Sequence, residues 1–268
     1  SCELRCGVQA FRFPRVGAGL AGWRDSLKWG ICVRPGMEPE GECMSSVFKY
    51  SSREFNERLL LLGNTRIGTL YDFRRTEHAR GIADPQEGKK EVAHHITEVT
   101  DKDKESIHWK AIEAFGFMSF EGGENIKVIG GTFINQFDEP DCYMHCSSAD
   151  YTYDAMSQLE NADSCVEVFD ALGFYRRITE TLNMLVGVNF EGVFKVKYMK
   201  RNSLWNGSDW GEHPALIKEP EYKRQVEIRA IWTPKNSKPI SPVFLNDVGL
   251  IKFCRRIATP KPDAVKRK

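Results

Sequence analysis

The sequence predicts an α+β fold in which a mostly antiparallel sheet is flanked by a few helices. Segments with the two-residue alternation of β-strands outnumber segments with helical periodicity. Most neighbouring strand segments are joined by connections too short for a helical crossover, which favours antiparallel pairing. The chain has 268 residues, 41% hydrophobic and 28% charged, a composition typical of globular proteins. One large packed domain is therefore expected.

A strand followed by a helix opens the patterned part of the chain. Residues 47–50 (VFKY) alternate as a short strand. Ser51 or Ser52 then caps a helix that runs through Leu62, and Gly63 ends it. This segment therefore predicts a strand–helix unit.

The remaining elements are mainly strands. One more helix is expected over residues 172–185, where apolar side chains recur at helical spacing with arginines on the other face, and Gly187 ends it. The expected strands cover residues 65–73, 92–99, 113–120, 126–133, 141–147, 165–169, 193–198 and 225–232.

The segments outside this patterned region differ in composition. Residues 1–43 are rich in glycine and proline without a sustained period, and we expect a weakly ordered N-terminal extension. The patterned domain, residues 44–258, begins at Met44, which is expected to be an internal start. Residues 259–268 form a Pro- and Lys-rich tail that should be loose.

The bulk composition excludes some classes of function. Lys and Arg total 38 against 37 Asp and Glu, so no global field attracts nucleic acid or acidic membrane. No stretch approaches the roughly 20 apolar residues of a membrane span, and no secretory signal is visible. Eight scattered cysteines fit a reduced, cytoplasmic protein. Cys142 and Cys146 lack a second ligand pair, so no metal site is expected.

The sharpest candidate site is the segment QVEIR. In an extended strand, residues two apart point to the same face. Gln225, Glu227 and Arg229 should therefore share one polar surface, while Val226 and Ile228 face the core. A solvated strand face is the simpler alternative reading.

Two other polar groups could complete a site. Ser147 and Ser148 close a predicted strand, and strand ends commonly hold functional groups, although a serine turn would look the same. Tyr71, Arg74 and Arg75 open a segment crowded with charges. Arginine forks suit a pyrophosphate because the planar guanidinium can bond two oxygens at once.

An arginine, a serine strand end and a late Gln-x-Glu strand, in this order, resemble the R-S-E pattern of ADP-ribosyltransferases. The chain also resembles, more loosely, bacterial proteins of the DUF2971 type, through the opening strand Phe48-Lys49-Tyr50, a CxS-like strand end and a closing strand like E-x-E-x-R. Together these segments cover Met44 to about Trp232.

The resemblance implies a transferase that uses NAD as its ADP-ribose donor. Breaking the glycosidic bond develops positive charge on the ribose carbon, and Glu227 would stabilise it while Gln225 orients the acceptor. The acceptor would be a protein or nucleic acid, as in a bacterial toxin or phage-defence effector.

The resemblance also assigns the cofactor-binding residues. Either Arg74 or Arg75 would hold the pyrophosphate, either Ser147 or Ser148 would position the nicotinamide ribose, and Tyr71 would stack on the nicotinamide ring. Lys49, Tyr50 and Arg229 complete the expected NAD-binding set.

Three other readings stay open. A nucleic-acid-binding or processing module could use a locally basic region, made of Arg176, Arg177, Lys195, Lys197, Lys200 and Arg201. A metal-dependent hydrolase could use His78, Asp84, Glu87, His94 and His95, but these lack the spacing of known metal motifs. A non-enzymatic interaction protein is the third.

Overall fold

The computed structural model describes residues 3–5, 10–12, 46–75, 81–116 and 126–262. The strands are β1 (Glu3–Arg5), β2 (Ala10–Arg12), β3 (Val47–Ser51), β4 (Asn64–Thr69), β5 (Lys89–Thr100), β6 (Lys127–Asp138), β7 (Tyr143–Ser148), β8 (Ser164–Val168), β9 (Val188–Lys195), β10 (Lys197–Tyr198), β11 (Asn202–Leu204), β12 (Ile217–Lys218), β13 (Glu227–Pro234), β14 (Val243–Asn246) and β15 (Cys254–Arg256). The α-helices are α1 (Arg53–Leu62), α2 (Ile107–Ala114), α3 (Tyr153–Ser157) and α4 (Ala171–Leu185), and the 3-10 helices are η2 (Asp72–Arg74), η3 (Pro214–Leu216), η4 (Pro220–Gln225) and η5 (Val248–Phe253).

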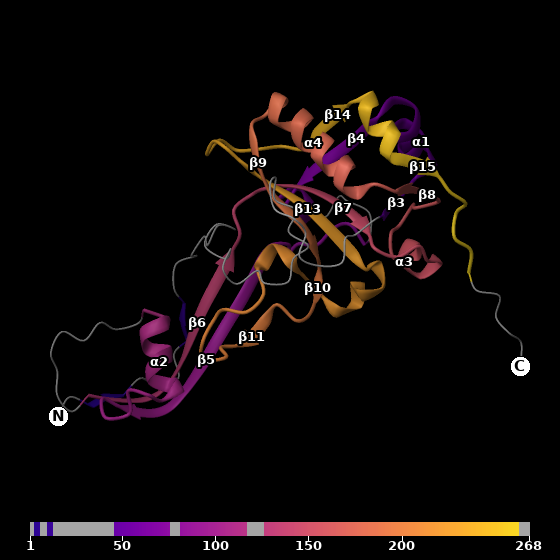
Figure 1. Cartoon of the computed structure of the whole chain (residues 1–268). Coiled ribbons are helices and arrows are strands. Elements are labelled where there is room, and N and C mark those ends of the chain that lie inside the picture. The colour runs from indigo at the N-terminus through magenta and orange to yellow at the C-terminus, as the bar shows by residue number, and fades with distance from the viewer. Residues whose placement is uncertain (1–2, 6–9, 13–45, 76–80, 117–125, 263–268) are drawn as a thin grey trace, which may run out of the picture.

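The main sheet is built around β7. Along one path its order is β14-β4-β7-β3-β8-β15, and β13 joins β7 to β9 on the other edge of β7. Every pair in this sheet is antiparallel. The predicted α+β class with a mostly antiparallel sheet is confirmed, and β7 lies in the middle of the body (Figure 1).

The strands β3 and β4 share one edge of β7 but pair with different parts of it. β4 pairs at Tyr143 and Met144, whereas β3 pairs at Ser148. Between these two points β7 has no ladder partner on this edge among the described strands. The sheet is therefore split beside Cys146.

Helices α1 and α4 cover one face of the main sheet. The hydrophobic core there includes Leu59 of α1, Phe174 and Leu182 of α4, and Ile228 and Trp232 of β13, all almost fully buried. Alternation along β13 places Ile228, Ala230 and Trp232 in this core, which leaves Glu227 and Arg229 for the other face.

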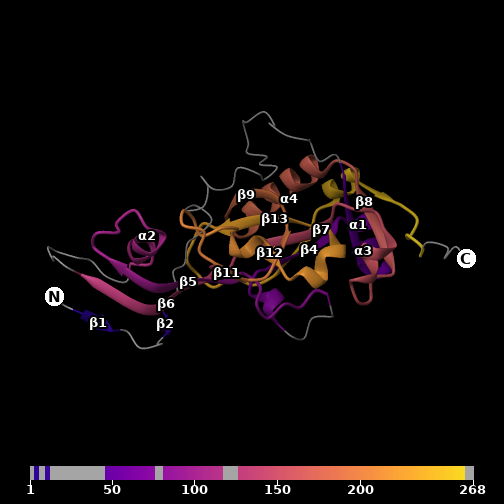
Figure 2. The same ribbon diagram turned by 90° about the horizontal axis from the view of Figure 1, so that it is seen from below.

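A long two-stranded arm extends from the body (Figures 1 and 2). β5 and β6 are 12 residues each and pair antiparallel, with α2 packed against them. The arm has its own apolar cluster, which includes Trp109, Phe133 and Trp205. The parallel pairs lie mostly here: β1 and β2 with β6, and β11 with β5; the remaining one is β10 with β12.

The predicted strand–helix unit and the second long helix are confirmed. β3 and α1 follow the expected order, and Gly63 ends α1 in the left-handed conformation (φ 62°), which glycine adopts without a Cβ clash. α4 spans Ala171–Leu185, and the Asp170 side chain caps it by accepting the Gly173 N–H.

Several predicted boundaries are wrong. Residues 113–120 were expected to be a strand, but α2 ends at Ala114, and residues 117–125 lie outside the described part. Ser106 caps α2 by accepting the Trp109 N–H, a local signal that overrides the β-rich composition downstream. The first 43 residues hold two short strands, although no strand period was recognised there.

Two strand ends near the site also differ from the prediction. The strand expected over residues 65–73 ends at Thr69, because the chain turns into η2. The strand expected to begin at Gln225 begins at Glu227, because Gln225 ends the 3-10 helix η4.

Candidate functional site

A pocket opens where β3 and β4 separate along β7. Its volume is about 540 Å³, and it is closed on the other side of β7 by β13 and Lys218. The Lys49 Nζ donates to the Cys146 carbonyl at 2.9 Å, where β7 has no ladder partner on the β3–β4 edge among the described strands. The split in the sheet therefore creates the pocket, and a lysine amine satisfies backbone exposed in it.

The pocket brings together most of the predicted site residues. Those that line it are Lys49, Tyr50, Ser147, Ser148, Gln225, Glu227 and Arg229. Since these residues come from β3, β7, η4 and β13, their convergence depends on the tertiary fold.

Glu227 is a buried carboxylate, and each of its two oxygens accepts a hydrogen bond from a cationic side chain. Its Oε1 accepts from Arg229 Nε at 2.8 Å, and its Oε2 accepts from Lys218 Nζ at 2.9 Å. Its backbone N–H donates to the Tyr198 hydroxyl at 2.7 Å. Burial alone would raise the pKa of Glu227, but the charges of Arg229 and Lys218 outweigh it and hold the pKa well below its usual range. Glu227 is therefore a fixed, ionised group.

Arg229 is committed to internal partners. Its Nη1 and Nη2 bind the two oxygens of Glu87 at 2.8 and 2.9 Å, and Nη1 also donates to the Ala215 carbonyl at 2.6 Å. With the bond to Glu227, four of the five guanidinium N–H groups are used. Arg229 therefore mainly stabilises the site, because most of its N–H donors already have partners within the protein.

Gln225 and Glu227 both accept hydrogen bonds from the Lys218 ammonium group. Gln225 Oε1 accepts from Lys218 Nζ at 2.7 Å, and its Nε2 donates to the Gly81 carbonyl at 3.0 Å. Val226 between them is left-handed (φ 43°, ψ 51°), a conformation that strains a β-branched residue. The strain lies between the two residues predicted to carry the chemistry.

The two serines have different environments. Ser148 Oγ donates to the Gln225 carbonyl at 2.8 Å. Ser147 Oγ shares a hydrogen bond of 2.9 Å with the Tyr175 hydroxyl on α4, on the core side of the sheet. Of the two alternatives, Ser148 is the one whose side chain belongs to the Gln225–Glu227 cluster.

The other side of the pocket combines cations with aromatic side chains. Burial lowers the pKa of the Lys49 amine, and the charge of Arg66 on β4 lowers it further. Arg66 Nη2 binds Asp72 Oδ2 at 2.5 Å. Aromatic rings contribute to the same lining, namely Phe48, Tyr50, Phe55, Phe73 and Phe244. An aromatic, partly cationic pocket suits a ligand with flat rings and negative charge.

No protein-family model, curated protein or solved structure matches this chain. The chemistry of the pocket is therefore the basis for a functional proposal. In the part of the chain that the structure describes, no helix is long and apolar enough to cross a membrane.

Tyr71, Arg74 and Arg75 do not join this pocket. Arg74 binds Asp138 at 2.7 Å and the Glu87 carbonyl at 2.7 Å, and its guanidinium carbon lies 4.1 Å from the centre of the Tyr71 ring. The chain turns away at η2 after β4, which removes these residues from the Glu227 side.

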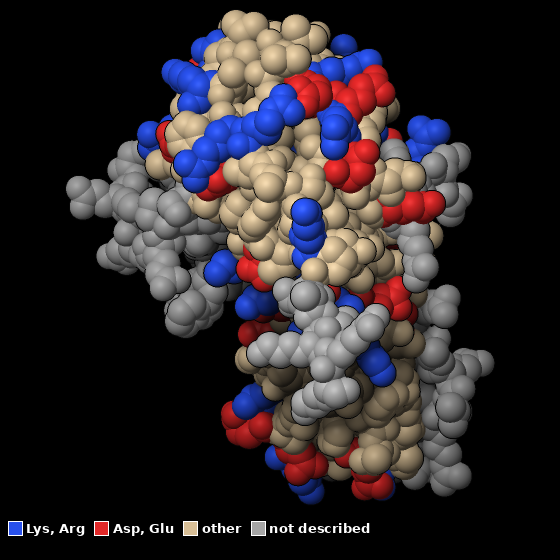
Figure 3. Space-filling model, turned by 90° about the vertical axis from the view of Figure 1, so that its right-hand side faces the viewer, with Lys and Arg blue, Asp and Glu red and all other residues tan. Residues whose placement is uncertain are grey.

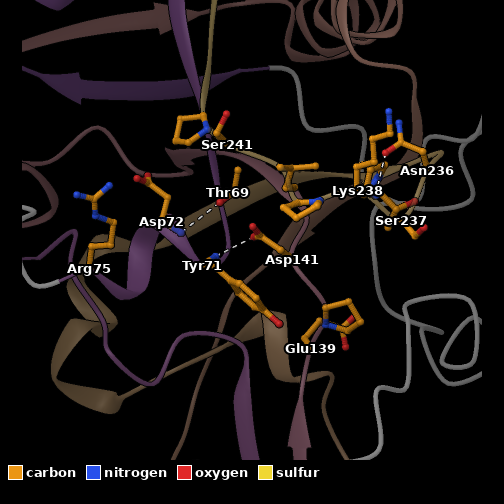
Figure 4. Close-up of a pocket in the computed structure, with 16 residues that line it drawn as sticks. Thr69, Tyr71, Asp72, Arg75, Glu139, Asp141, Asn236, Ser237, Lys238 and Ser241 are labelled. Carbon is orange, nitrogen blue, oxygen red and sulfur yellow. Dashed lines mark hydrogen bonds between the residues drawn. The ribbon is translucent and has the colours of Figure 1, made fainter.

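Tyr71 and Arg75 instead line a second cavity of about 770 Å³ (Figure 4). The Tyr71 N–H donates to Asp141 Oδ1 at 2.9 Å, and the Asp72 N–H donates to the Thr69 hydroxyl at 3.1 Å. Burial raises the pKa of Asp141. This cavity has no cluster comparable to the one around Glu227 among the hydrogen bonds of its described lining residues.

The residues proposed for a metal-dependent hydrolase are dispersed. Asp84 binds Arg201, Glu87 binds Arg229, and His94 Nε2 lies 3.0 Å from His108 Nδ1. His78 lies outside the described residues. Among the described residues, no three His, Cys, Asp or Glu side chains are grouped as metal ligands.

The locally basic region is also not one free surface. Arg177 binds Asp247 at 2.6 Å, and Arg201 is buried against Asp84. On the face shown in Figure 3, positive and negative groups are interspersed. Arg176, Lys195, Lys197 and Lys200 are exposed, so the nucleic-acid alternative now rests on these four residues.

Sequence reasoning missed Lys218 and Arg66. Lys218 follows an apolar run, and its side-chain hydrogen bonds are all with residues at least seven positions away. Arg66 lies inside a predicted strand, where a charged residue is ordinarily a solvated one. Neither has a local sequence signal.

Proposed function

We propose that the pocket binds NAD and that the protein is an ADP-ribosyltransferase-like enzyme, in fold and activity, that transfers ADP-ribose to a macromolecular acceptor. The observation that carries the proposal is Glu227, a buried carboxylate kept ionised at one side of a pocket with cations and aromatic rings. The mostly antiparallel sheet also supports it.

Glu227 has the charge that this reaction needs. When nicotinamide leaves with the electrons of the glycosidic bond, positive charge develops on the ribose carbon, and a nucleophile of the acceptor then bonds to that carbon. A preorganised anion lowers the barrier to this step. Each carboxylate oxygen has two acceptor sites, so Glu227 can still accept a ribose hydroxyl beside Arg229 and Lys218.

Lys49 and Arg66 are better placed for the pyrophosphate than Arg74 or Arg75. Both line the pocket, and their like charges lie close enough for Arg66 to lower the pKa of Lys49. An ammonium group has three N–H donors, and the structure shows one of those of Lys49 in use. A pyrophosphate between the two cations would relieve their repulsion.

The size and walls of the pocket also fit a dinucleotide. Its volume of about 540 Å³ lies within the range of roughly 300–1,000 Å³ for small-molecule sites. Phe48 and Phe55 lie next to Lys49 and the α1 start, where a base or nicotinamide ring can pack on them.

Nicotinamide release from NAD tests the proposal. Wild type should release nicotinamide, and Glu227→Gln should lower kcat about 100-fold, the typical loss for one electrostatic contact to the transition state. The control is Glu180→Gln, on the exposed side of α4, which should match wild type. Circular dichroism confirms that both variants fold. No release by wild type, with or without added protein or nucleic acid, contradicts the enzymatic proposal.

Ligand-induced thermal shift separates NAD from nucleic acid. A ligand that binds only the native state raises the melting temperature. NAD should raise it in wild type and raise it less in Lys49→Met, whereas Lys223→Met, outside the pocket lining, should behave like wild type. A shift with single-stranded DNA or RNA and none with NAD would favour the nucleic-acid reading instead.

A further inference from the structure

Lys218 contacts both Glu227 and Gln225, the two residues to which the family resemblance gives catalytic roles. It is 4% exposed, and its Nζ donates to Glu227 Oε2 at 2.9 Å and Gln225 Oε1 at 2.7 Å. A longer bond of 3.4 Å reaches the Gly81 carbonyl. All three N–H groups of the ammonium therefore have acceptors inside the protein.

The strand that pairs with the Lys218 strand holds the backbone of Glu227. β12 pairs in parallel with β10, and the Tyr198 hydroxyl of β10 accepts the Glu227 N–H at 2.7 Å. The Val196 N–H, just before β10, donates to the Glu227 carbonyl at 3.0 Å. Tyr198 of β10 and Val196 just before it therefore hold the N–H and the carbonyl of Glu227, respectively.

We propose that Lys218 is a positioning residue, which keeps the Glu227 carboxylate and the Gln225 carboxamide in a fixed mutual arrangement during ADP-ribosyl transfer. This inference rests on the proposed function for its kinetic consequence. Its structural consequence, control over the ionisation of Glu227, does not depend on NAD.

The electrostatic role of Lys218 is separable from that of Arg229. Burial opposes the ionised form of Glu227, and two cations offset it, Arg229 on one oxygen and Lys218 on the other. Removing Lys218 leaves one cation against the same burial. The carboxylate would then take up a proton at a higher pH.

Lys218→Met is the informative variant, because it removes the charge and keeps much of the side-chain volume. The control is Lys197→Met on the neighbouring strand, where the lysine is exposed. A carbon-13 NMR titration should show a higher pKa of Glu227 in Lys218→Met than in wild type, and an unchanged pKa in Lys197→Met. Lys218→Arg, which keeps the charge, should restore most of the depression.

Steady-state kinetics distinguish a positioning role of Lys218 from a role in ligand binding. In Lys218→Met, kcat for nicotinamide release should fall at least about tenfold while KM changes less than about threefold, because the lost contact orients reacting groups. The acid limb of the pH profile should move to higher pH. A rise in KM with unchanged kcat would overturn the positioning role.

The two proposals fail in different ways. If wild type does not cleave NAD but the Glu227 pKa rises in Lys218→Met, the proposed function fails and the control of Glu227 by Lys218 stands. An unchanged Glu227 pKa overturns the inference whatever the activity. If Lys218→Met does not fold, the wild-type protein supplies the test through the nitrogen-15 NMR signal of Lys218 Nζ. This signal should shift at the pH where Glu227 titrates. A signal that does not shift there contradicts the inference.

Discussion

Buried charges concentrate around Arg229, and their energetics depend on complete pairing. Arg229 forms ion pairs with Glu87 and Glu227, both almost fully buried, and Lys218 pairs with Glu227 as well. A buried ion pair contributes little by itself, but a buried charge without its partner is strongly destabilising. The network therefore makes the site rigid and sensitive to single substitutions.

Removing Arg229 should destabilise the whole protein. Arg229→Met leaves two buried carboxylates without their shared partner, and the free energy of unfolding should fall by about 3–5 kcal/mol. Arg224→Met, at an arginine exposed beside the site, should change it by less than about 0.5 kcal/mol. Urea denaturation measures both. A loss below about 1 kcal/mol for Arg229→Met would mean that the network is solvated.

We expect that replacing Val226 by glycine increases the free energy of unfolding. Its left-handed backbone costs a β-branched residue on the order of 1–3 kcal/mol, and glycine removes that cost. Val226→Gly should therefore raise the free energy of unfolding by about 1 kcal/mol. The same change at the exposed Val248, where φ is not positive, should lower it. Equal losses at both positions would contradict the strain.

At the scale of elements, sequence periodicity predicted the central strands and the helices α1 and α4, and it missed α3, β11, β12, β14 and β15. β3, α1 and α4 carry their patterns locally, including the Gly63 stop, so they could be read directly. α2 was missed because its start depends on one serine cap and its surroundings favour β-structure.

Strand alternation predicted which residues of β13 share one face, whereas tertiary packing decides which other residues line the same pocket. Alternation placed Glu227 and Arg229 on one face, away from Ile228. Arg74 and Arg75 lie outside the Glu227 pocket because η2 ends the strand early, which no periodicity indicates. Lys218 enters the site only through the pairing of β12 with β10.

The end of α1 offers a direct test of local geometry. A Cβ added to Gly63 would lie 1.9 Å from the Asp247 carbonyl oxygen, whereas a Cβ on Gly116 would meet nothing within 4 Å. Both glycines have nearly the same positive φ, 62° and 63°. Gly116→Ala should cost about 1 kcal/mol from backbone strain, and Gly63→Ala clearly more. Thermal unfolding compares them. Equal costs would show that α1 does not pack closely against the turn at Asp247.

At the scale of the whole molecule, the stability should depend on pH through paired carboxylates. Hydrogen bonds from Arg177 lower the pKa of Asp247 to about 2, below its usual value near 3.9. A carboxylate with a depressed folded-state pKa contributes stability that is present above its unfolded pKa and lost as the pH falls through the folded value.

The contribution of Asp247 should therefore disappear between about pH 4 and pH 2. Asp247→Asn should be less stable than wild type at pH 7, and the difference should shrink across this window. Urea unfolding at a series of pH values measures it. A difference that stays constant from pH 7 to the acid limit would show that the loss is not electrostatic.

The body and the arm have separate apolar clusters, and the pocket belongs to the body. The cluster around Trp109 and Trp205 lies along β5 and β6, whereas β3, β4, β7 and β13 frame the pocket. The arm is therefore free of the proposed chemistry, and the split between β3 and β4 is the feature on which the functional account depends.

A crystal structure of the protein with NAD is the most direct test of that account. The dinucleotide should lie in the split of the main sheet, with its pyrophosphate near Lys49 and Arg66 and its nicotinamide ribose near Glu227. NAD in the cavity beside Tyr71 and Arg75, or no bound NAD at concentrations that saturate dinucleotide-binding enzymes, would contradict it.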